Sequence, residues 1–126
     1  MVEKQENRFL AVVQDIFFGA KITAAAKRVG VKVDFIQDES KLMQEAQLSP
    51  CVVLLDLNNA GIHPVELIQR LKDSPLDRPV QIIGFLSHVQ GELMREAQKA
   101  GCDLVLPRSV FSQNLDELLR QRSCHL

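Results

Sequence analysis

The chain has 126 residues, of which 46% are hydrophobic and 25% are charged, as in one soluble globular domain. Its formal net charge of −1 gives no electrostatic indication of a nucleic-acid or anionic-membrane partner. No apolar run approaches membrane-spanning length, and the polar N-terminal residues do not resemble a signal peptide. The three cysteines (Cys51, Cys102 and Cys124) lack metal-ligand spacing, and two of them look like small buried hydrophobes in a reducing compartment. We therefore expect one cytoplasmic domain over residues 1–126, with polar tails at 1–7 and 122–126.

Strand and helix patterns alternate along this chain. Short apolar runs predict strands at 9–13, 31–36, 51–56, 80–85 and 104–106. Helical spacing with start and stop residues predicts helices at 16–29, 38–47, 64–72, 90–100 and 112–121. Five strands alternating with five helices indicate an α/β fold with a doubly wound, five-stranded parallel sheet and helices on both faces. The expected strand order is 2-1-3-4-5, which is flavodoxin-like.

The first helix is expected to begin just after Asp15, where a carboxylate suits the free backbone amides of an N-cap. Phe17 and Phe18 follow in the first turn. Adjacent helical residues cannot both face the sheet, so one of the two is expected at the surface or at the mouth of a pocket.

The run from Cys51 to Asp56 is the most informative segment. Five apolar residues in succession, ended by an aspartate, are typical of a strand buried on both faces of a parallel sheet. Ligands of such sheets gather beyond the carboxyl ends of the strands. Two interpretations of Asp56 remain open at this point: the working group of a site, or a capping or salt-bridged residue at a strand end.

The Asp56 strand and the segment Gly-Cys-Asp-Leu-Val-Leu at 101–106 give the chain a resemblance to the receiver domains of bacterial two-component response regulators, over roughly residues 8–120. In that family the aspartate ending the third strand accepts a phosphoryl group, and the resemblance assigns this role to Asp56. The family also holds magnesium with an acidic pair after the first strand, where this chain has Gln14 and Asp15. The resemblance implies a phosphorelay signalling domain in the cytoplasm, without enzyme activity of its own.

Two further positions depart from the pattern of the family. Its fourth strand ends in Thr or Ser, a position that falls here on Leu86 or Ser87, depending on the register. The lysine that ends its fifth strand is absent here. Counting from Gly101 places Arg108 at the lysine position, whereas aligning the prolines places Leu106 there.

Phosphoryl transfer to a carboxylate requires that the repulsion between two anions be cancelled, and the family achieves this with a divalent cation, an ammonium and a hydroxyl. Asp15, Asp56 and the carbonyl of Asn58 are candidate ligands of a weak Mg²⁺ site. An arginine does not replace a compact ammonium and is suited to a bidentate bond with one of these acids. We therefore expect Arg108 to occupy the space of the metal and the phosphate.

The preferred hypothesis is a stand-alone, atypical receiver-like domain that needs no cofactor and acts by protein contact. Its degenerate pocket is expected to contain Asp15, Asp56, Ser87, His88 and Arg108. From the resemblance, the expected contact surface comprises the fourth helix, the fifth strand and the fifth helix, where receivers dimerise or dock partners. A histidine kinase, an output protein or a second copy of the chain is the expected partner, with no direct nucleic-acid or membrane contact.

Two alternatives stay open. In the first, the domain is a functional phosphoacceptor, with Asp56 modified, Mg²⁺ held by Asp15 and Asn58, and the phosphate bound by Ser87 and Arg108. In the second, the domain is a sensor that binds a small anion among Lys21, His88 and Arg108.

Overall fold

The computed structural model describes residues 5–48, 50–73, 80–87 and 91–125. The strands of its main sheet are β2 (Arg8–Val12), β3 (Val33–Phe35), β4 (Cys51–Asp56), β5 (Val80–Leu86) and β6 (Leu104–Pro107). The helices are α1 (Ile16–Val29), α2 (Glu39–Ala46), α3 (Pro64–Asp73), α4 (Gly91–Ala100), α5 (Arg108–Gln113) and α6 (Leu115–Gln121). None of the helices in these ranges is long and apolar enough to cross a membrane.

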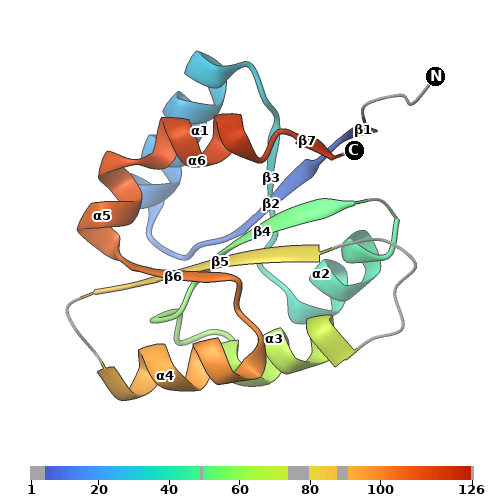
Figure 1. Cartoon of the computed structure of the whole chain (residues 1–126), viewed down its shortest axis with the longest axis vertical. Coiled ribbons are helices and arrows are strands. Elements are labelled where there is room, and N and C mark those ends of the chain that lie inside the picture. The colour runs from blue at the N-terminus through green and yellow to red at the C-terminus, as the bar shows by residue number, and fades with distance from the viewer. Residues whose placement is uncertain (1–4, 49, 74–79, 88–90, 126) are drawn as a thin grey trace.

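The five strands form one parallel sheet in the order β3-β2-β4-β5-β6. Counted along the chain within this sheet, that order is 2-1-3-4-5, so the predicted topology is confirmed. Helices α1, α5 and α6 cover one face of the sheet, and α2, α3 and α4 cover the other (Figure 1). Because every pairing is parallel, the carboxyl ends of the strands lie along one edge.

The central strand β4 shows why its sequence is apolar without interruption. All six of its residues are buried. Val52 and Leu54 contribute to the core beneath α1, α5 and α6, whereas Val53 and Leu55 contribute to the core beneath α2, α3 and α4. Alternate side chains of a strand point to opposite faces, so a strand covered on both sides has no position for a polar residue until it ends at Asp56.

Helix α1 begins and ends where the sequence predicts. The Oδ1 atom of Asp15 accepts hydrogen bonds from the backbone amides of Phe17 at 2.8 Å and Phe18 at 3.3 Å, so Asp15 is the N-cap. Gly30 ends the helix with a φ of 84°, a left-handed conformation that favours glycine. Phe18 is 5% exposed and Phe17 is 78% exposed, which confirms that only one of the pair faces the core.

The prediction of one last helix over 112–121 is wrong in its extent. Helix formation begins directly after Pro107, at Arg108, and the segment is divided into α5 and α6 at Asn114. The side-chain amide of Asn114 donates to the carbonyl of Val110 at 2.9 Å. Asparagine side chains compete with the backbone for such carbonyls, so this bond accompanies a local departure from helical geometry.

The segments expected as polar tails are partly structured. Strand β1 (Gln5–Glu6) pairs with β7 (Cys124–His125) in a separate antiparallel ribbon near the two ends of the chain.

The prediction that two of the cysteines are buried is confirmed, because Cys51 and Cys102 are both buried free thiols. Burial raises the pKa of the Cys51 thiol to about 11, so this group is protonated and unreactive at neutral pH.

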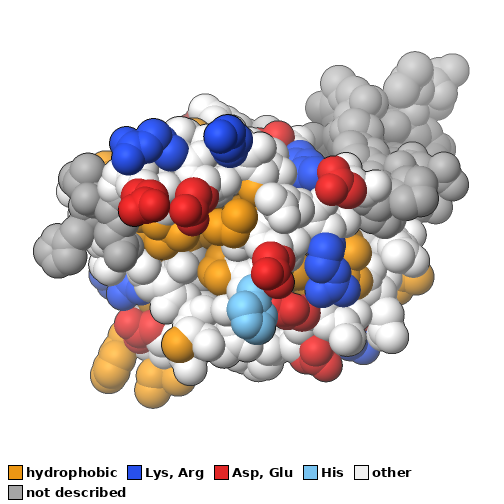
Figure 2. Space-filling view, turned by 90° about the horizontal axis from the view of Figure 1, so that it is seen from below, with side chains coloured by type: hydrophobic (Ala, Val, Ile, Leu, Met, Phe, Trp, Pro, Cys, Tyr) orange, Lys and Arg blue, Asp and Glu red, His pale blue; other side chains and the backbone are white. Residues whose placement is uncertain are grey.

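Charged side chains on the surface are mixed in sign. On the lower face, which carries α3 and α4, acidic and basic groups are interspersed, and hydrophobic side chains protrude at its lower left edge (Figure 2). Among the residues described, this face therefore presents no extended basic patch of the kind that binds a nucleic-acid backbone.

Three phenylalanine rings hold α1, β5 and α5 together. The Phe85 ring stacks on Phe111 with centroids 4.5 Å apart and on Phe18 with centroids 4.7 Å apart. Phe111 is fully buried, and it is the one buried side chain of α5. This stack fixes α5 against the sheet.

We expect Phe111→Ala to lower the free energy of unfolding by about 3–5 kcal/mol, because it removes a buried ring and leaves a cavity. Urea denaturation measures this change. Phe17→Ala is the matched control, and at this exposed position the change is expected to stay within about 0.5 kcal/mol. Equal decreases in the free energy of unfolding of the two variants would contradict the assignment of Phe111 to the core.

Candidate functional site

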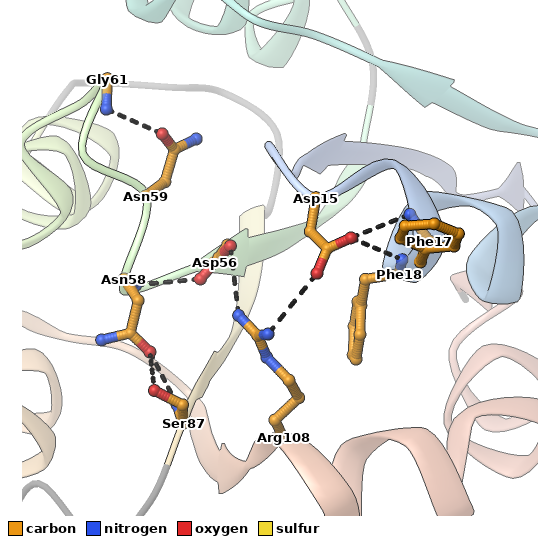
Figure 3. A network of polar contacts seen from close by, with 9 residues as sticks. All are labelled: Asp15, Phe17, Phe18, Asp56, Asn58, Asn59, Gly61, Ser87 and Arg108. Atoms are coloured by element: carbon orange, nitrogen blue, oxygen red, sulfur yellow. Dashed lines mark hydrogen bonds and ion pairs between the residues drawn. The ribbon is translucent and has the colours of Figure 1, made fainter.

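The candidate site lies beyond the carboxyl ends of four neighbouring strands (Figure 3). Asp15 follows β2, Asp56 ends β4, Ser87 follows β5 and Arg108 follows β6. These residues are distant in the sequence, and the parallel arrangement of the sheet brings them together.

The guanidinium of Arg108 lies between the two acids. Its Nη1 atom is 3.7 Å from Oδ2 of Asp15, and its Nη2 atom is 3.7 Å from Oδ2 of Asp56. These distances exceed those of hydrogen bonds, so the contacts are ion pairs. The guanidinium carbon is also 5.2 Å from the centroid of the Phe18 ring, within the range of a cation–π contact.

The arrangement differs in one respect from the bidentate bond that an arginine favours. Oδ1 of Asp15 already accepts from two backbone amides of α1, and Oδ1 of Asp56 accepts from the backbone amide of Asn58 at 2.9 Å. Each acid therefore has one remaining oxygen toward Arg108, which contacts both acids with one nitrogen each. The Nε atom of Arg108 is buried and has no hydrogen-bond partner in the described part of the chain.

The carboxyl group of Asp56 is held in an environment that disfavours its charge. Asp56 is 3% exposed. Burial is the largest influence and raises the pKa of Asp56, while the Asn58 amide and the charge of Arg108 lower this pKa and the charge of Asp15 raises it. The net direction is upward, so the two favourable contacts do not fully compensate for the loss of water.

The Asn58 side chain connects β4 to β5. Its Oδ1 atom accepts from the backbone amide of Ser87 at 2.6 Å and from the Ser87 hydroxyl at 3.1 Å. Leu86 is fully buried in the core on the α3 and α4 side. Of the two positions left open by the sequence, Ser87 is therefore the one that lies at the site.

The residues present fit a magnesium ion poorly. Oδ2 of Asp15 and Oδ2 of Asp56 both face the guanidinium of Arg108, and Gln14 is an exposed neutral residue where the resemblance implies a second acid. Within the described residues, no three His, Cys, Asp or Glu side chains are grouped so that they could hold a metal ion. A divalent cation would have to displace the guanidinium to reach both carboxylates.

A hollow of about 910 Å³ opens beside Arg108, between α1 and α5. Lys21, Phe17, Ser109 and Val110 are among the residues that line it, so the structure brings Lys21 to the same hollow as Arg108. His88, the remaining candidate pocket residue, lies outside the described residues.

Sequence analysis did not assign two contacts of this site. One is the cation–π contact of Arg108 with Phe18, and the other is the bond from Ser87 to the side chain of Asn58. The spacing of Asn58, two residues after a strand-end aspartate, was the available signal for the second contact, because the turn there lies beside the end of the neighbouring strand.

Comparisons with known proteins support the fold. No family model matches the chain, and no curated protein matches it. Among solved structures, the chain is similar to a response regulator from Hahella chejuensis, with a TM-score of 0.77, 16% identity and coverage of 89% of this chain and 91% of that chain. It is also similar to a signal receiver domain from Bermanella marisrubri, with a TM-score of 0.77, 20% identity and coverage of 94% and 98%.

A third similar structure is the receiver domain of a sensor histidine kinase from Pseudomonas aeruginosa, which has a magnesium ion coordinated in its active-site cleft. Its TM-score is 0.76, with 16% identity and coverage of 94% of this chain and 98% of that chain. The chain therefore has the fold of response-regulator receiver domains, as the resemblance implied.

We expect Asp56→Asn to leave the free energy of unfolding at pH 7 equal to or above that of the original chain. The pKa of Asp56 is raised in the folded state, so the ionised group lowers stability above that pKa, and this cost vanishes as the pH falls through it. Asparagine keeps an acceptor for the Asn58 amide and carries no charge.

Urea denaturation at a series of pH values, from just below the ordinary pKa of an aspartate up to neutral pH, measures the effect. The difference in free energy of unfolding between Asp56→Asn and the original chain should be largest at the highest pH and should shrink as the pH is lowered. Glu96→Gln, on the exposed side of α4, is the control for loss of one acid. A loss of stability in Asp56→Asn that is the same at every pH would contradict this account.

Proposed function

We propose that the chain is a receiver-like signalling domain that acts through protein contact and does not depend on phosphorylation of Asp56. The observation that supports this most directly is the guanidinium of Arg108 between Asp15 and Asp56. The response regulators and the sensor-kinase receiver whose fold the chain shares support a bacterial two-component context.

The chemistry of phosphoryl transfer explains why Arg108 is an obstacle. The anionic donor must approach Oδ2 of Asp56, and an exchangeable cation must contact both the carboxylate and the incoming phosphoryl oxygens. Arg108 supplies positive charge, but it is tethered and lies in the space that the cation would need. Gln14 supplies a neutral amide in place of a second carboxylate, which weakens the attraction for Mg²⁺.

We propose α5 as the centre of the contact surface. The fifth helix of the expected surface spans residues 112–121, which the structure divides into the end of α5 and the whole of α6. Helix α5 therefore borders that surface together with α4 and β6, and β6 is an edge strand of the sheet. Val110 of α5 is 36% exposed and lines the hollow beside Arg108 together with Phe17 of α1. The hollow therefore places Val110 of α5 close to Phe17, which is one of the most exposed hydrophobic side chains among the described residues. A histidine kinase, an output protein or a second copy are the candidate partners.

Incubation with acetyl phosphate and Mg²⁺, followed by intact mass measurement, tests the proposal. We expect no labile phosphoryl adduct on the original chain. The double variant Gln14→Asp, Arg108→Lys restores the second acid and a compact ammonium, and it is expected to gain an adduct that requires Mg²⁺.

Addition of Asp56→Asn to this double variant is the control and should abolish the adduct. An adduct of the original chain that is lost in Asp56→Asn would contradict the proposal and favour a functional phosphoacceptor.

A further inference from the structure

We infer that the chain forms a symmetric dimer with a second copy of itself through the outer face of α1, in which the two α1 helices pack antiparallel about Ala20. The inference rests on the proposed action through protein contact, and it names both the partner and the face. The observation that carries it is the apolar character of α1 on the side that faces solvent.

The side of α1 that points away from the sheet consists of apolar and small residues. Ile16 is 79% exposed and Phe17 is 78% exposed. Ala20, Thr23 and Ala24 continue this exposed side along the helix. The opposite side also is apolar and supplies the buried residues of the helix, which are Phe18, Ile22, Ala25 and Ala26. A helix that is apolar on both sides is normally covered on both sides, so we expect a further surface to cover the outer face of α1.

The exposed apolar patch extends beyond α1 on both sides. Phe35 at the end of β3 is 41% exposed, and its ring lies beside Gly19 of α1. Val110 of α5 is 36% exposed and lines the same hollow as Phe17. Of the exposed large hydrophobic side chains in the described ranges, only Leu48 lies outside this patch. The flanking residues enlarge the area that a contact would bury, which matters because stable interfaces bury roughly 1,000 Å² or more.

The face that the resemblance implies for dimerisation has a different character. The exposed residues of α4 include Glu92, Arg95, Glu96 and Lys99, all of them charged. Among the residues that the structure describes, no exposed large hydrophobic side chain lies on α4, β6 or α6. Burial of charged groups is costly unless each finds a partner, so the outer face of α1 is better suited to self-association.

Charge decides between parallel and antiparallel packing of the two helices. Helix α1 has no acidic residue, and its cations are Lys21, Lys27 and Arg28. Arg28 already pairs with Asp116 of α6. A parallel pair would place Lys27 beside Lys27 of the second copy. An antiparallel pair separates these two cations and brings each toward the first turn of the other helix, where the side chain of Asp15 is 40% exposed.

The spacing of the exposed residues gives the register. Residues four apart lie on one side of a helix, so Ile16, Ala20 and Ala24 form one row. With the two-fold axis at Ala20, Ile16 of each copy lies level with Ala24 of the other, and Phe17 lies level with Thr23. Large side chains then pack over small ones, as ridges pack into grooves. The Thr23 hydroxyl already donates to a backbone carbonyl of its own helix at 3.0 Å, so its burial leaves no donor unpaired.

Analytical ultracentrifugation over roughly 1 μM to 1 mM protein, without any phosphodonor, tests the inference. We expect a monomer–dimer equilibrium that Ile16→Lys weakens at least about tenfold, because a charge replaces an apolar side chain in the contact. Leu48→Lys is the matched control and should leave the equilibrium unchanged, since Leu48 is 64% exposed and lies outside the patch. A monomer over the whole range, a dimer that Ile16→Lys does not weaken, or an equal effect of both substitutions would overturn the inference.

A cysteine at the symmetry axis tests the antiparallel register. Ala20→Cys is expected to give a disulfide-linked dimer under mild oxidation, because the same position of both copies meets there. The background carries Cys124→Ser, since the other two cysteines, Cys51 and Cys102, are buried. Gln98→Cys on the exposed side of α4 is the control and should remain monomeric. Cross-linking of Gln98→Cys in place of Ala20→Cys would assign the contact to α4, and equal cross-linking of both would indicate random collision. Either result would overturn the inference.

These outcomes are distinct from those of the acetyl phosphate measurement. A monomer would overturn the dimer alone and would leave a histidine kinase or an output protein as the candidate partner. A phosphoryl adduct on Asp56 of the original chain would contradict the proposed function and leave the dimer in place.

Discussion

The carboxylate of Asp56 is buried at the edge of the sheet, where the loss of water disfavours its charge and a backbone hydrogen bond and a nearby cation oppose that effect. Transfer of an ionised group from water to a protein interior is costly, and the contacts that this environment supplies leave the pKa of Asp56 above its usual value. The nearest cationic partner among the described residues is Arg108, which also faces Asp15. This charge pairing decides which oxygens of the site remain accessible, because each acid presents its Oδ2 atom to Arg108.

A covalently attached cation and a bound metal ion satisfy the same electrostatic need with different consequences. A metal ion exchanges with solvent. Because it binds only some of the time, its binding energy is available to a reaction or a conformational change. A guanidinium that is part of the chain is present at all times, and its cost is included in folding. In the function proposed for this chain, the receiver-type fold is kept while the tethered cation removes a condition for phosphoryl transfer, and this directs attention to the protein-binding surfaces.

The sequence was sufficient for the fold and for part of the site. The burial of β4 on both faces, the N-cap at Asp15 and the parallel strand order follow from local patterns and from the rule that strands in such sheets end along one edge. Distances between side chains could not be predicted, because the position of Arg108 depended on how the chain turns at Pro107. The division at Asn114 and the bond from Ser87 to Asn58 also depend on contacts between segments distant in sequence, which periodicity does not encode.

The most direct test of the central claim is a titration of the Asp56 carboxyl carbon by NMR in the original chain and in Arg108→Met. If the guanidinium is the cation that sustains the buried charge, the pKa of Asp56 rises further when Arg108 is replaced, because its charge lowers this pKa in the folded protein. An unchanged pKa would mean that Arg108 does not neutralise Asp56. The claim that a cation built into the chain supports the buried charge of this site would then be wrong.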